Sequence, residues 1–273
     1  MCVRPISGTT GRKNACSVWL LSIRSEFLID YDLRAGESLD ELILGNLKII
    51  QPRRGYRFSI DAVLLAHFPD VAGIKRIVEL GSGNGVVSLL TAWRAAQAQV
   101  TAVEIQPAMA ERSRRSVLLN GLQEQIDIIE ADIKNIEEIL PGGEAELVLS
   151  NPPFWRKGEG KVSREQEEAI ARHEIKLSLP ELAQKGAYLL ASGGTLDIIH
   201  RAERLDEIMT LFRKHNLPVR KLRFVHGFAD REAKLVMIEG VKNRPGSLKV
   251  MPPLIIYERV GSYSQELRQL YGG

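Results

Sequence analysis

Cysteine is nearly absent from this chain: among 273 residues there are two, Cys2 and Cys16, and both lie near the start. A disulfide scaffold and a cysteine-rich metal site are therefore excluded. The lack of cysteine in the remaining chain fits a reducing compartment, so we expect a cytoplasmic protein. The five histidines are scattered without the spacing of metal ligands, and we expect no bound metal.

Long hydrophobic runs are missing as well. The apolar stretch at residues 15–23 ends at Arg24 and falls far short of the roughly 20 residues that a membrane span needs. No small-x-small cleavage motif follows it, which argues against a secretory signal. We expect residues 1–37 to be a disordered N-terminal extension and residues 38–273 to form one domain.

The composition contains no internal repeat and no low-complexity stretch. Hydrophobic residues make up 44% of the chain and charged residues 26%, which is typical of a globular protein that buries a full core. The 37 Lys and Arg exceed the 34 Asp and Glu by only three, so the net charge of +3 permits an anionic partner without requiring one.

Hydrophobic periodicity alternates between strands and helices from residue 74 onward. Such alternation predicts an α/β fold, with a mostly parallel sheet and helices on both faces. The last two strands are joined by a short link and can be antiparallel. The expected strands are two short ones within 40–50 around a Gly-Asn turn, then 76–80, 100–105, 126–129, 145–150, 195–199, 219–225 and 233–241. The expected helices are 60–68 with Ser59 as its cap, 86–98, one through Met109 and Leu118, 133–140, 179–190 and one ending near 215, with a mobile loop at 156–168.

A glycine-rich turn, Glu79-Leu80-Gly81-Ser82-Gly83-Asn84-Gly85, joins the first regular strand to its helix. Glycines let the backbone turn tightly and approach a ligand, and the helix N-terminus offers unpaired N–H groups. This setting predicts a nucleotide-type cofactor site, although such a turn can also be purely structural. The G-x-G-x-G spacing differs from the G-x-G-x-x-G of dinucleotide binders, which disfavours a nicotinamide cofactor.

Two acidic residues follow the next two strands. Glu104 ends the second strand, where a carboxylate can accept hydrogen bonds from both hydroxyls of a ribose. Asp132 lies at the same edge of the sheet and can hold an adenine amino group, with Ile105 and Ile133 covering the faces of the ring. Asp132 can equally be the N-cap of the following helix.

The sharpest local signal is Asn151-Pro152-Pro153-Phe154, directly after the fourth strand. Consecutive prolines fix the backbone, so the Asn151 amide and the nearby carbonyls are held in a rigid frame. The amide oxygen and a backbone carbonyl can both accept hydrogen bonds from one planar amino group, and Phe154 offers a face for stacking. A turn that merely ends the strand is the alternative.

Together these motifs resemble the class I S-adenosylmethionine-dependent methyltransferases that act on amino groups. Four further segments are similar to the bacterial N6-adenine methyltransferases of position 37 in valine tRNA, and the resemblance covers about residues 38–272. These segments are 55–66, 171–174, 223–233 and 252–257. The resemblance implies a Rossmann-like fold: a seven-stranded, mostly parallel sheet whose last strand is antiparallel.

The resemblance also assigns roles. The methionine part of S-adenosylmethionine would contact Glu79, Gly81, Ser82, Gly83 and Asn84. Glu104 would bind the ribose, and Asp132, Ile105 and Ile133 the adenine. Asn151, the Pro152 carbonyl and Phe154 would hold the target base, which makes them the expected catalytic residues. Arg57, Phe58, Ser59 and Asp61 would lie near the amino-acid end of the cofactor or the substrate mouth, or else form a helix cap and a packed aromatic. His173 and Glu174 match the family without a role that their chemistry explains.

A tRNA partner fits the distribution of charge. Residues 201–273 contain 14 Lys and Arg against 8 Asp and Glu, a net of +6, whereas residues 1–200 contain 23 against 26, a net of −3. Phosphate groups attract such an excess. The basic residues that cluster in this C-terminal third are Lys214, Arg220, Lys221, Arg223, Arg231, Lys234, Lys242, Arg244 and Lys249. They can also be ordinary solvated surface.

Three alternatives remain at this point. Asn-Pro-Pro-aromatic also occurs in methyltransferases of guanine N2 in ribosomal RNA and of the release-factor glutamine amide, so the tetrapeptide alone does not choose a substrate. A nicotinamide-dependent oxidoreductase fits the sheet but not the turn spacing. A non-catalytic RNA-binding module would not need the full set of cofactor residues.

Overall fold

The computed structural model describes residues 33–271 except 43, 56, 153 and 155–176. Residues 1–32 of the expected N-terminal extension, the loop at 156–168 and the pair His173-Glu174 lie outside the described residues. Residues 34–273 form one compact unit. Its first strand begins at Glu37, one residue before the domain boundary that the sequence predicts.

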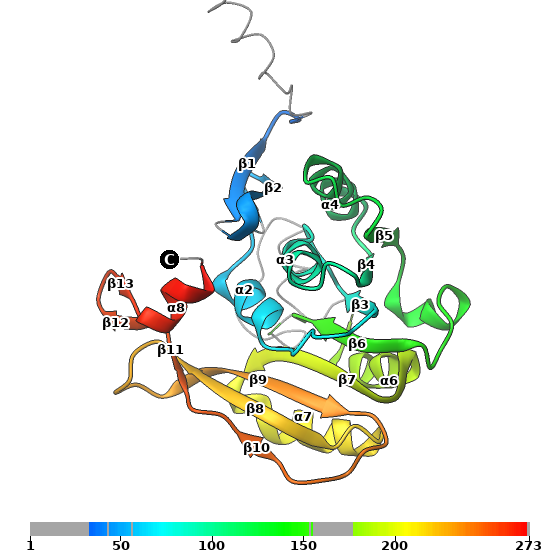
Figure 1. Cartoon of the computed structure of the whole chain (residues 1–273), viewed down its shortest axis with the longest axis vertical. Coiled ribbons are helices and arrows are strands. Elements are labelled where there is room, and N and C mark those ends of the chain that lie inside the picture. Colours follow the sequence, from blue (N-terminus) through cyan, green and yellow to red (C-terminus); the bar gives the residue numbers. More distant parts are fainter. Residues whose placement is uncertain (1–32, 43, 56, 153, 155–176, 272–273) are drawn as a thin grey trace, which may run out of the picture. The chain divides into compact units, whose positions relative to one another are not determined.

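A twisted sheet of nine strands runs through this unit (Figure 1), in the order β10-β8-β9-β7-β6-β3-β4-β5, with β11 also paired to β8. Its strands are β3 (Arg76–Leu80), β4 (Gln99–Glu104), β5 (Ile126–Glu130), β6 (Ala145–Ser150), β7 (Leu190–Arg201), β8 (Val219–His226), β9 (Ala233–Val241), β10 (Lys249–Val250) and β11 (Leu254–Ile255). Only β9 is antiparallel to its neighbours, β7 and β8. The mostly parallel sheet of seven main strands is therefore confirmed. The sheet also contains two short strands that the sequence analysis does not predict, β10 and β11, both paired with β8 at its edge.

Helices cover both faces of the sheet, as expected (Figure 1). One core lies under α2 (Ile60–His67), α3 (Val86–Arg94) and α4 (Pro107–Leu119), and the other lies under η2 (Ile133–Glu138), α6 (Leu179–Leu189) and α7 (Leu205–Lys214), which η3 (Ala202–Arg204) precedes. Successive strand residues serve opposite cores: Ile77 packs in the first and Val78 in the second. Because both faces are buried, the strands read as continuous apolar runs.

Two helix predictions need correction. The helix expected at 86–98 ends at Arg94, because Ala95 leaves the helical region with φ −117° and ψ 65°. A turn then forms in which Ala98 N–H donates to the Ala95 carbonyl, and this turn leads directly into β4. Residues 133–138 form a 3-10 helix, with non-helical backbone at Asn135.

An N-terminal hairpin joins β1 (Glu37–Leu42) to antiparallel β2 (Leu47–Pro52) through η1 (Leu44–Asn46). Gly45 and Asn46 both have positive φ, at 68° and 53°, so the expected Gly-Asn turn is confirmed. The hairpin is fastened to α4, where Ser116 Oγ accepts the Ile50 N–H at 2.9 Å and Arg115 pairs with Glu37 at 2.6 Å. This contact holds the segment before α2 against the rest of the unit.

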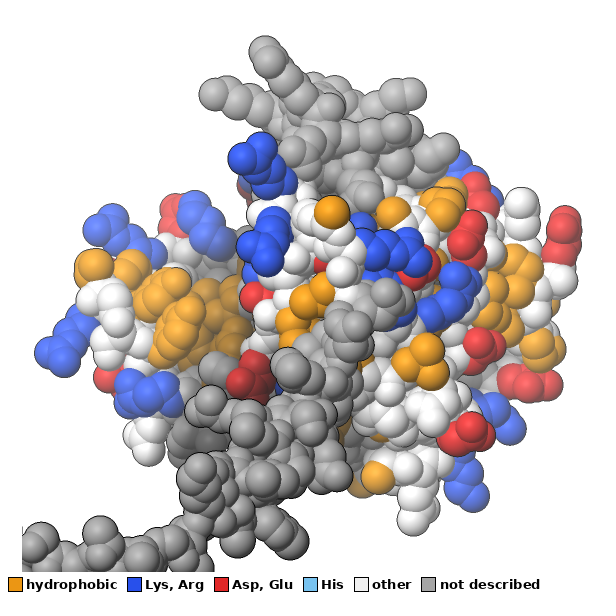
Figure 2. All heavy atoms as spheres, turned by 90° about the horizontal axis from the view of Figure 1, so that it is seen from above, with side chains coloured by type: hydrophobic (Ala, Val, Ile, Leu, Met, Phe, Trp, Pro, Cys, Tyr) orange, Lys and Arg blue, Asp and Glu red, His pale blue; other side chains and the backbone are white. Residues whose placement is uncertain are grey.

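The chain ends in a small hairpin, β12 (Tyr257–Arg259) and β13 (Ser262–Tyr263), followed by α8 (Gln265–Leu270). Helix α8 packs against α2. Hydrophobic side chains are exposed at the left of Figure 2, where Figure 1 places this segment. No helix within the described residues is both long and apolar enough to cross a membrane.

Candidate active site

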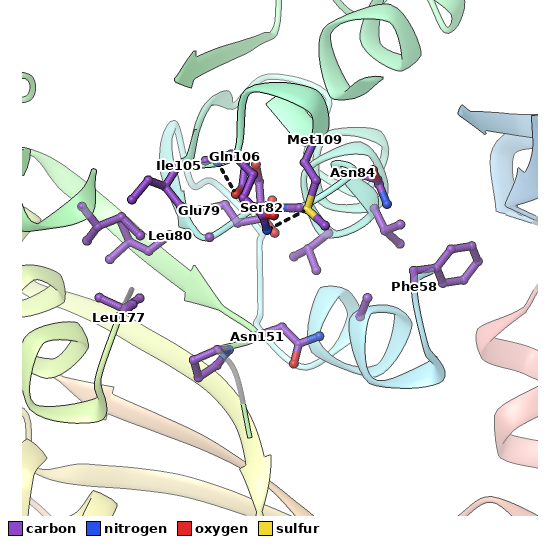
Figure 3. A pocket seen from close by; sticks show the side chains of 18 residues that line it. Phe58, Glu79, Leu80, Ser82, Asn84, Ile105, Gln106, Met109, Asn151 and Leu177 are labelled. Carbon is purple, nitrogen blue, oxygen red and sulfur yellow. Dashed lines mark hydrogen bonds between the residues drawn. The ribbon is translucent and has the colours of Figure 1, made fainter. Parts of the chain in front are cut away.

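A pocket opens at the carboxyl ends of β3, β4 and β6 (Figure 3), the edge at which open α/β sheets bind ligands. Eleven of the residues that the sequence analysis selects line it: Phe58, Glu79, Gly81, Ser82, Gly83, Asn84, Glu104, Ile105, Ile133, Asn151 and Pro152. The fold therefore brings together motifs that are about 70 residues apart in the chain.

The turn after β3 requires glycine for its backbone. Gly81, Gly83 and Gly85 have φ of 78°, 57° and 89°, a left-handed conformation that other residues rarely adopt. A Cβ atom at Gly81 would face open space, so only the backbone conformation demands glycine there. At Gly85 a Cβ would also collide with the Ser113 hydroxyl of α4. The turn thus lies close to α4 and leaves its inner side open to the pocket.

Two buried polar atoms of this turn have no partner among the described residues: the Ser82 hydroxyl and the Asn84 Nδ2. The other amide atom of Asn84, Oδ1, accepts a hydrogen bond from Arg112 Nε at 3.0 Å, which fixes the orientation of the side chain. Buried polar atoms are nearly always hydrogen-bonded in folded proteins. Their position in the pocket lining therefore indicates that a bound polar ligand completes the site.

Glu104 is buried at the end of β4 and accepts two backbone hydrogen bonds. Gly83 N–H donates to one carboxylate oxygen and Gln106 N–H to the other, each at 2.8 Å. Burial raises the pKa of Glu104, although these hydrogen bonds and the charge of Arg112 act in the opposite direction. Each oxygen keeps a further lone pair with which it can accept a hydrogen bond from a ligand hydroxyl.

Glu79 is the second buried carboxylate of the pocket, with 1% of its surface exposed. Burial raises its pKa to about 8, and the negative charge of Glu104 adds to this effect. The Ser88 hydroxyl donates a hydrogen bond to Glu79 Oε2. Two adjacent buried acids favour a ligand that carries positive charge, because such a ligand relieves their repulsion.

Asn151 and Pro152 enter the pocket from the end of β6. Ser150 Oγ donates to the Leu80 carbonyl at 2.7 Å and so ties the end of β6 to the end of β3. Figure 3 shows Asn151 between Leu177 and Phe58, on the opposite side of the pocket from Gln106 and Met109. The Asn151 amide has no hydrogen bond to another side chain or backbone group in the part of the chain that is described, which leaves both its polar atoms available.

Phe154 does not line the pocket in the structure. Its ring instead packs against His200, with the ring centroids 5.3 Å apart and the planes inclined by 58°. His200 is fully buried at the end of β7, and its Nδ1 accepts the Arg201 N–H at 2.8 Å. The stacking face therefore lies beside the pocket, next to the neighbouring strand.

Asp132 and Arg57 are not part of the lining either. Asp132 is the N-cap of η2, where its Oδ1 accepts the Lys134 N–H at 3.0 Å. Of the two roles that the sequence allows, the structure thus shows the helix cap. The pocket is lined instead by its neighbour Ile133. Arg57 forms an ion pair with Asp40 at 2.8 Å and thereby ties the segment before α2 to β1.

The prediction that Ser59 caps α2 is confirmed for its position in the chain. Ser59 is the N-cap of α2, but its side chain makes no capping hydrogen bond. The hydroxyl donates to Asp61 Oδ2 at 2.8 Å instead. Burial raises the pKa of Asp61, so this short contact stabilises a carboxylate that would otherwise be poorly solvated.

Several lining residues escaped the sequence analysis, chiefly Gln106, Met109 and Leu177. Gln106 Nε2 lies 3.3 Å from the Met109 sulfur, and both residues belong to the start of α4. Leu177 precedes α6 and comes from the opposite core. None of the three belongs to a motif with a characteristic spacing. Gln106 alone could have been selected from the sequence as a lining residue, because it comes two positions after Glu104 at the end of a strand.

In the ranges that the structure describes, no group of three or more His, Cys, Asp or Glu side chains is arranged to hold a metal ion.

Comparison with solved structures identifies the architecture. A structure described as a predicted O-methyltransferase from Agrobacterium tumefaciens superimposes with a TM-score of 0.62 at 23% identity, covering 78% of this chain and 95% of that one. The sheet order is thus that of the class I methyltransferase fold.

The family follows from the sequence match. The model of the family described as "Methyltransferase small domain" matches residues 61–225, more than half of the chain, and the chain belongs to this family. A tRNA1(Val) (adenine(37)-N6)-methyltransferase of Porphyromonas gingivalis is 29% identical over 78% of this chain and 86% of the relative. Its counterpart in Aliivibrio salmonicida is 27% identical over 79% of this chain and 89% of the relative.

Proposed function

We propose that this methyltransferase transfers the methyl group of S-adenosylmethionine to the exocyclic N6 of an adenine in tRNA, namely adenine 37 in the anticodon loop of valine tRNA. The observation that carries the proposal is the meeting of Asn151 and Pro152 with the glycine turn and Glu104 in one pocket. The names of the relatives supply the nucleoside and its position. A tRNA substrate also fits the cytoplasmic location that the sequence predicts.

The pocket fits S-adenosylmethionine by its own chemistry. The unpartnered Ser82 hydroxyl and Asn84 amide would bind the amino-acid end, and the spare lone pairs of Glu104 would accept from the ribose hydroxyls. The side chains of Ile105 and Ile133 would cover the adenine. When bound, S-adenosylmethionine would supply a methyl group from a positively charged sulfur, with the carbon–sulfur bond breaking as the new carbon–nitrogen bond forms and neutral S-adenosylhomocysteine remaining.

Asn151 and Pro152 would prepare the acceptor. The lone pair of an exocyclic amine is delocalised into its ring, so the amine is a poor nucleophile. Hydrogen bonds from its two N–H groups to the Asn151 Oδ1 and the Pro152 carbonyl would hold it out of conjugation and aim the lone pair. Fixed positioning of this kind supplies most of the rate without a strong base. The proton then leaves to solvent.

A base within an RNA loop must turn out of its stack to enter this pocket, and loop bases are cheaper to extrude than paired ones. Phe154, which leans on His200 beside the pocket, would stack on the extruded base after a change of its side-chain torsions. The two other N-methyltransferase substrates, guanine N2 of ribosomal RNA and the release-factor glutamine, present the same planar nitrogen. The relatives disfavour both of them, and the turn spacing disfavours a nicotinamide enzyme.

The test is transfer of a labelled methyl group to separate pools of tRNA, ribosomal RNA and release factor, followed by nucleoside analysis. We expect label in tRNA alone, recovered as N6-methyladenosine. Methylguanosine in ribosomal RNA or labelled glutamine in the release factor would replace the proposed substrate with one of the alternatives.

A further inference from the structure

Four aromatic rings form a continuous column in the C-terminal segment. The ring centroids of Phe228 and Tyr257 are 5.5 Å apart, those of Tyr257 and Tyr263 are 5.3 Å apart, and those of Tyr263 and Tyr271 are 6.2 Å apart. The last pair is almost parallel, with planes inclined by 1°. We call these four residues the aromatic column.

The column stands at the same edge of the sheet as the pocket. Phe228 follows the carboxyl end of β8 and Tyr257 follows that of β11, just as Asn151 follows that of β6. Three strand spacings separate β6 from β8, or about 14 Å at the usual distance between strands. A few nucleotides of a loop can bridge this distance.

The other end of the column lies near the start of α2. Tyr271 follows α8, and α8 packs against α2. Two residues at the start of α2 line the pocket, Phe58 just before the helix and Ala62 in its first turn. The Tyr271 end of the column therefore lies beside a helix that contributes to the pocket.

One ring of the column is exposed, and cations lie close to it in the sequence. Tyr263 has 45% of its surface exposed, whereas the other three rings are partly buried. Arg231 and Arg259 are exposed three residues after Phe228 and two residues after Tyr257. Arg259 forms no ion pair with any described residue. Arg231 is 3.9 Å from Asp230, and Arg268 is 3.5 Å from Glu258 and donates to the Tyr263 carbonyl at 2.5 Å. Figure 2 shows the corresponding hydrophobic patch at the left, with Lys and Arg side chains along its border.

Four of the nine basic residues that the charge count selects are used within the protein instead. Arg220 donates to the carbonyls of residues 244, 245 and 247, and Lys242 donates to the Leu190 carbonyl. Lys221 pairs with Glu239 at 2.5 Å, and Arg223 pairs with Glu266 at 2.7 Å. The RNA surface therefore cannot be read from net charge, and the location of the unpaired cations becomes decisive.

We infer that the aromatic column and the cations around it bind the single-stranded nucleotides next to the target base. This inference rests on the proposed function. Unpaired bases stack on aromatic rings regardless of sequence, and arginines both stack on bases and neutralise phosphates. A face that combines an exposed ring with exposed arginines, at the edge where the base must enter, offers both interactions to a loop that holds one base in the pocket.

The experiment measures kcat and KM for tRNA with Tyr263→Ala and Arg259→Ser enzymes, together with the affinity for S-adenosylmethionine. We expect KM for tRNA to rise about tenfold in each variant, since one stacked base or one phosphate contact is lost. The affinity for S-adenosylmethionine should not change. Tyr263→Phe keeps the ring and should retain a KM within twofold of the wild type.

Matched controls lie at the opposite edge of the sheet. Trp93 is 46% exposed in the last turn of α3, and Arg213 is exposed near the end of α7. Trp93→Ala and Arg213→Ser should leave KM for tRNA unchanged. Thermal unfolding of every variant separates lost RNA binding from a damaged fold.

Two results would overturn the inference. If the wild type methylates adenine in tRNA while the column variants keep its KM, the proposed function stands and the RNA surface lies elsewhere. If those variants keep KM but convert a dimer into a monomer in sedimentation, the patch is an interface between copies of this chain. An enzyme that methylates no tRNA at all would instead refute the proposed function, and the surface with it.

Discussion

The segment from β3 to β6 and the segment after β7 use their polar residues in opposite ways. In the first, Ser82 and Asn84 are buried with atoms that no described residue satisfies. In the second, Lys221 and Arg223 are neutralised by Glu239 and Glu266 on nearby elements. Unsatisfied buried groups that line a pocket indicate where a ligand binds, whereas satisfied charges mainly stabilise the fold. The predictions below test this distinction.

The largest effect is expected from Asn151→Ala. Removing the amide that is proposed to accept a hydrogen bond from the target amine should lower kcat by about 10²–10³-fold, because the interaction acts on the reacting atom. Isothermal titration should show unchanged affinity for S-adenosylmethionine. Asn135→Ala, in the exposed part of η2, is the control and should retain full activity. Normal turnover of the Asn151 variant would disprove its assigned role.

A smaller effect on binding is expected from Glu104→Gln. The amide replaces one acceptor oxygen by a donor that faces the Gly83 or Gln106 N–H, so the affinity for S-adenosylmethionine should fall about 10- to 100-fold. Glu130 lies opposite Glu104 in the sheet register, at the end of β5, and Glu130→Gln should bind normally. Equal affinities in the two variants would exclude Glu104 as the ribose acceptor.

Asp197 is a buried, unpartnered carboxylate that does not line the pocket, so it tests how burial alone affects stability. It lies opposite Glu239 in the register of β7 and β9, and neither of its carboxylate oxygens has a hydrogen-bond partner among the described residues. Burial, reinforced by the charge of Glu239, raises its pKa to about 8. The folded protein thus holds a proton that the unfolded chain releases near the ordinary aspartate pKa of 3.8, so stability falls as pH rises from about 4 to 8.

The Asp197→Asn variant should escape this loss. Its free energy of unfolding should exceed that of the wild type by about 1–4 kcal/mol at pH 9, with a smaller difference at pH 5. Urea unfolding at the two pH values measures the change. A difference that does not grow with pH would show that Asp197 ionises normally in the folded protein.

Glu79 provides the matching test beside the pocket, because its pKa is also about 8. As pH rises from 6 to 9 it loses its proton, and its negative charge then attracts a cationic ligand. Between pH 6 and pH 9 the affinity for S-adenosylmethionine should therefore rise several-fold relative to the affinity for S-adenosylhomocysteine, whose sulfur is neutral. Parallel pH profiles for the two ligands would place Glu79 outside the influence of the sulfur.

The smallest effect is expected from Arg223→Gln. Arg223 is already paired with Glu266 and also donates to the Pro252 carbonyl at 2.8 Å, so it contributes little to RNA binding. KM for tRNA should change less than twofold, and stability should fall by about 0–1 kcal/mol. A large rise in KM would instead support RNA binding by the broad basic surface that the charge count suggests.

The sequence predicts the fold well because its signals are local. Apolar runs such as 76–80 and 145–150 match β3 and β6, and the Gly-Asn turn of the first hairpin needs only its own backbone. The strands β10 and β11 escape prediction because they have two residues each and exist only through pairing with β8. The end of α3 is set by the turn into β4, which the helical pattern does not contain.

The site is only partly predictable, for a related physical reason. The turn at 81–85 and Asn151 have spacings that the chemistry requires, and the structure brings them into one pocket. Met109 and Leu177 approach it from other elements and belong to no local pattern. Arg223 is neutralised by Glu266, which is 43 residues away in the chain, so a count of nearby charges does not reveal that Arg223 is paired.

The most direct measurement uses two transcripts of valine tRNA, one with adenine at position 37 and one with guanine there. Each is incubated with the enzyme and labelled S-adenosylmethionine, then digested to nucleosides. If the pocket acts as described, one N6-methyladenosine forms per molecule of the first transcript and no label enters the second. Equal labelling of both transcripts, or label in another nucleoside, would contradict the central claim.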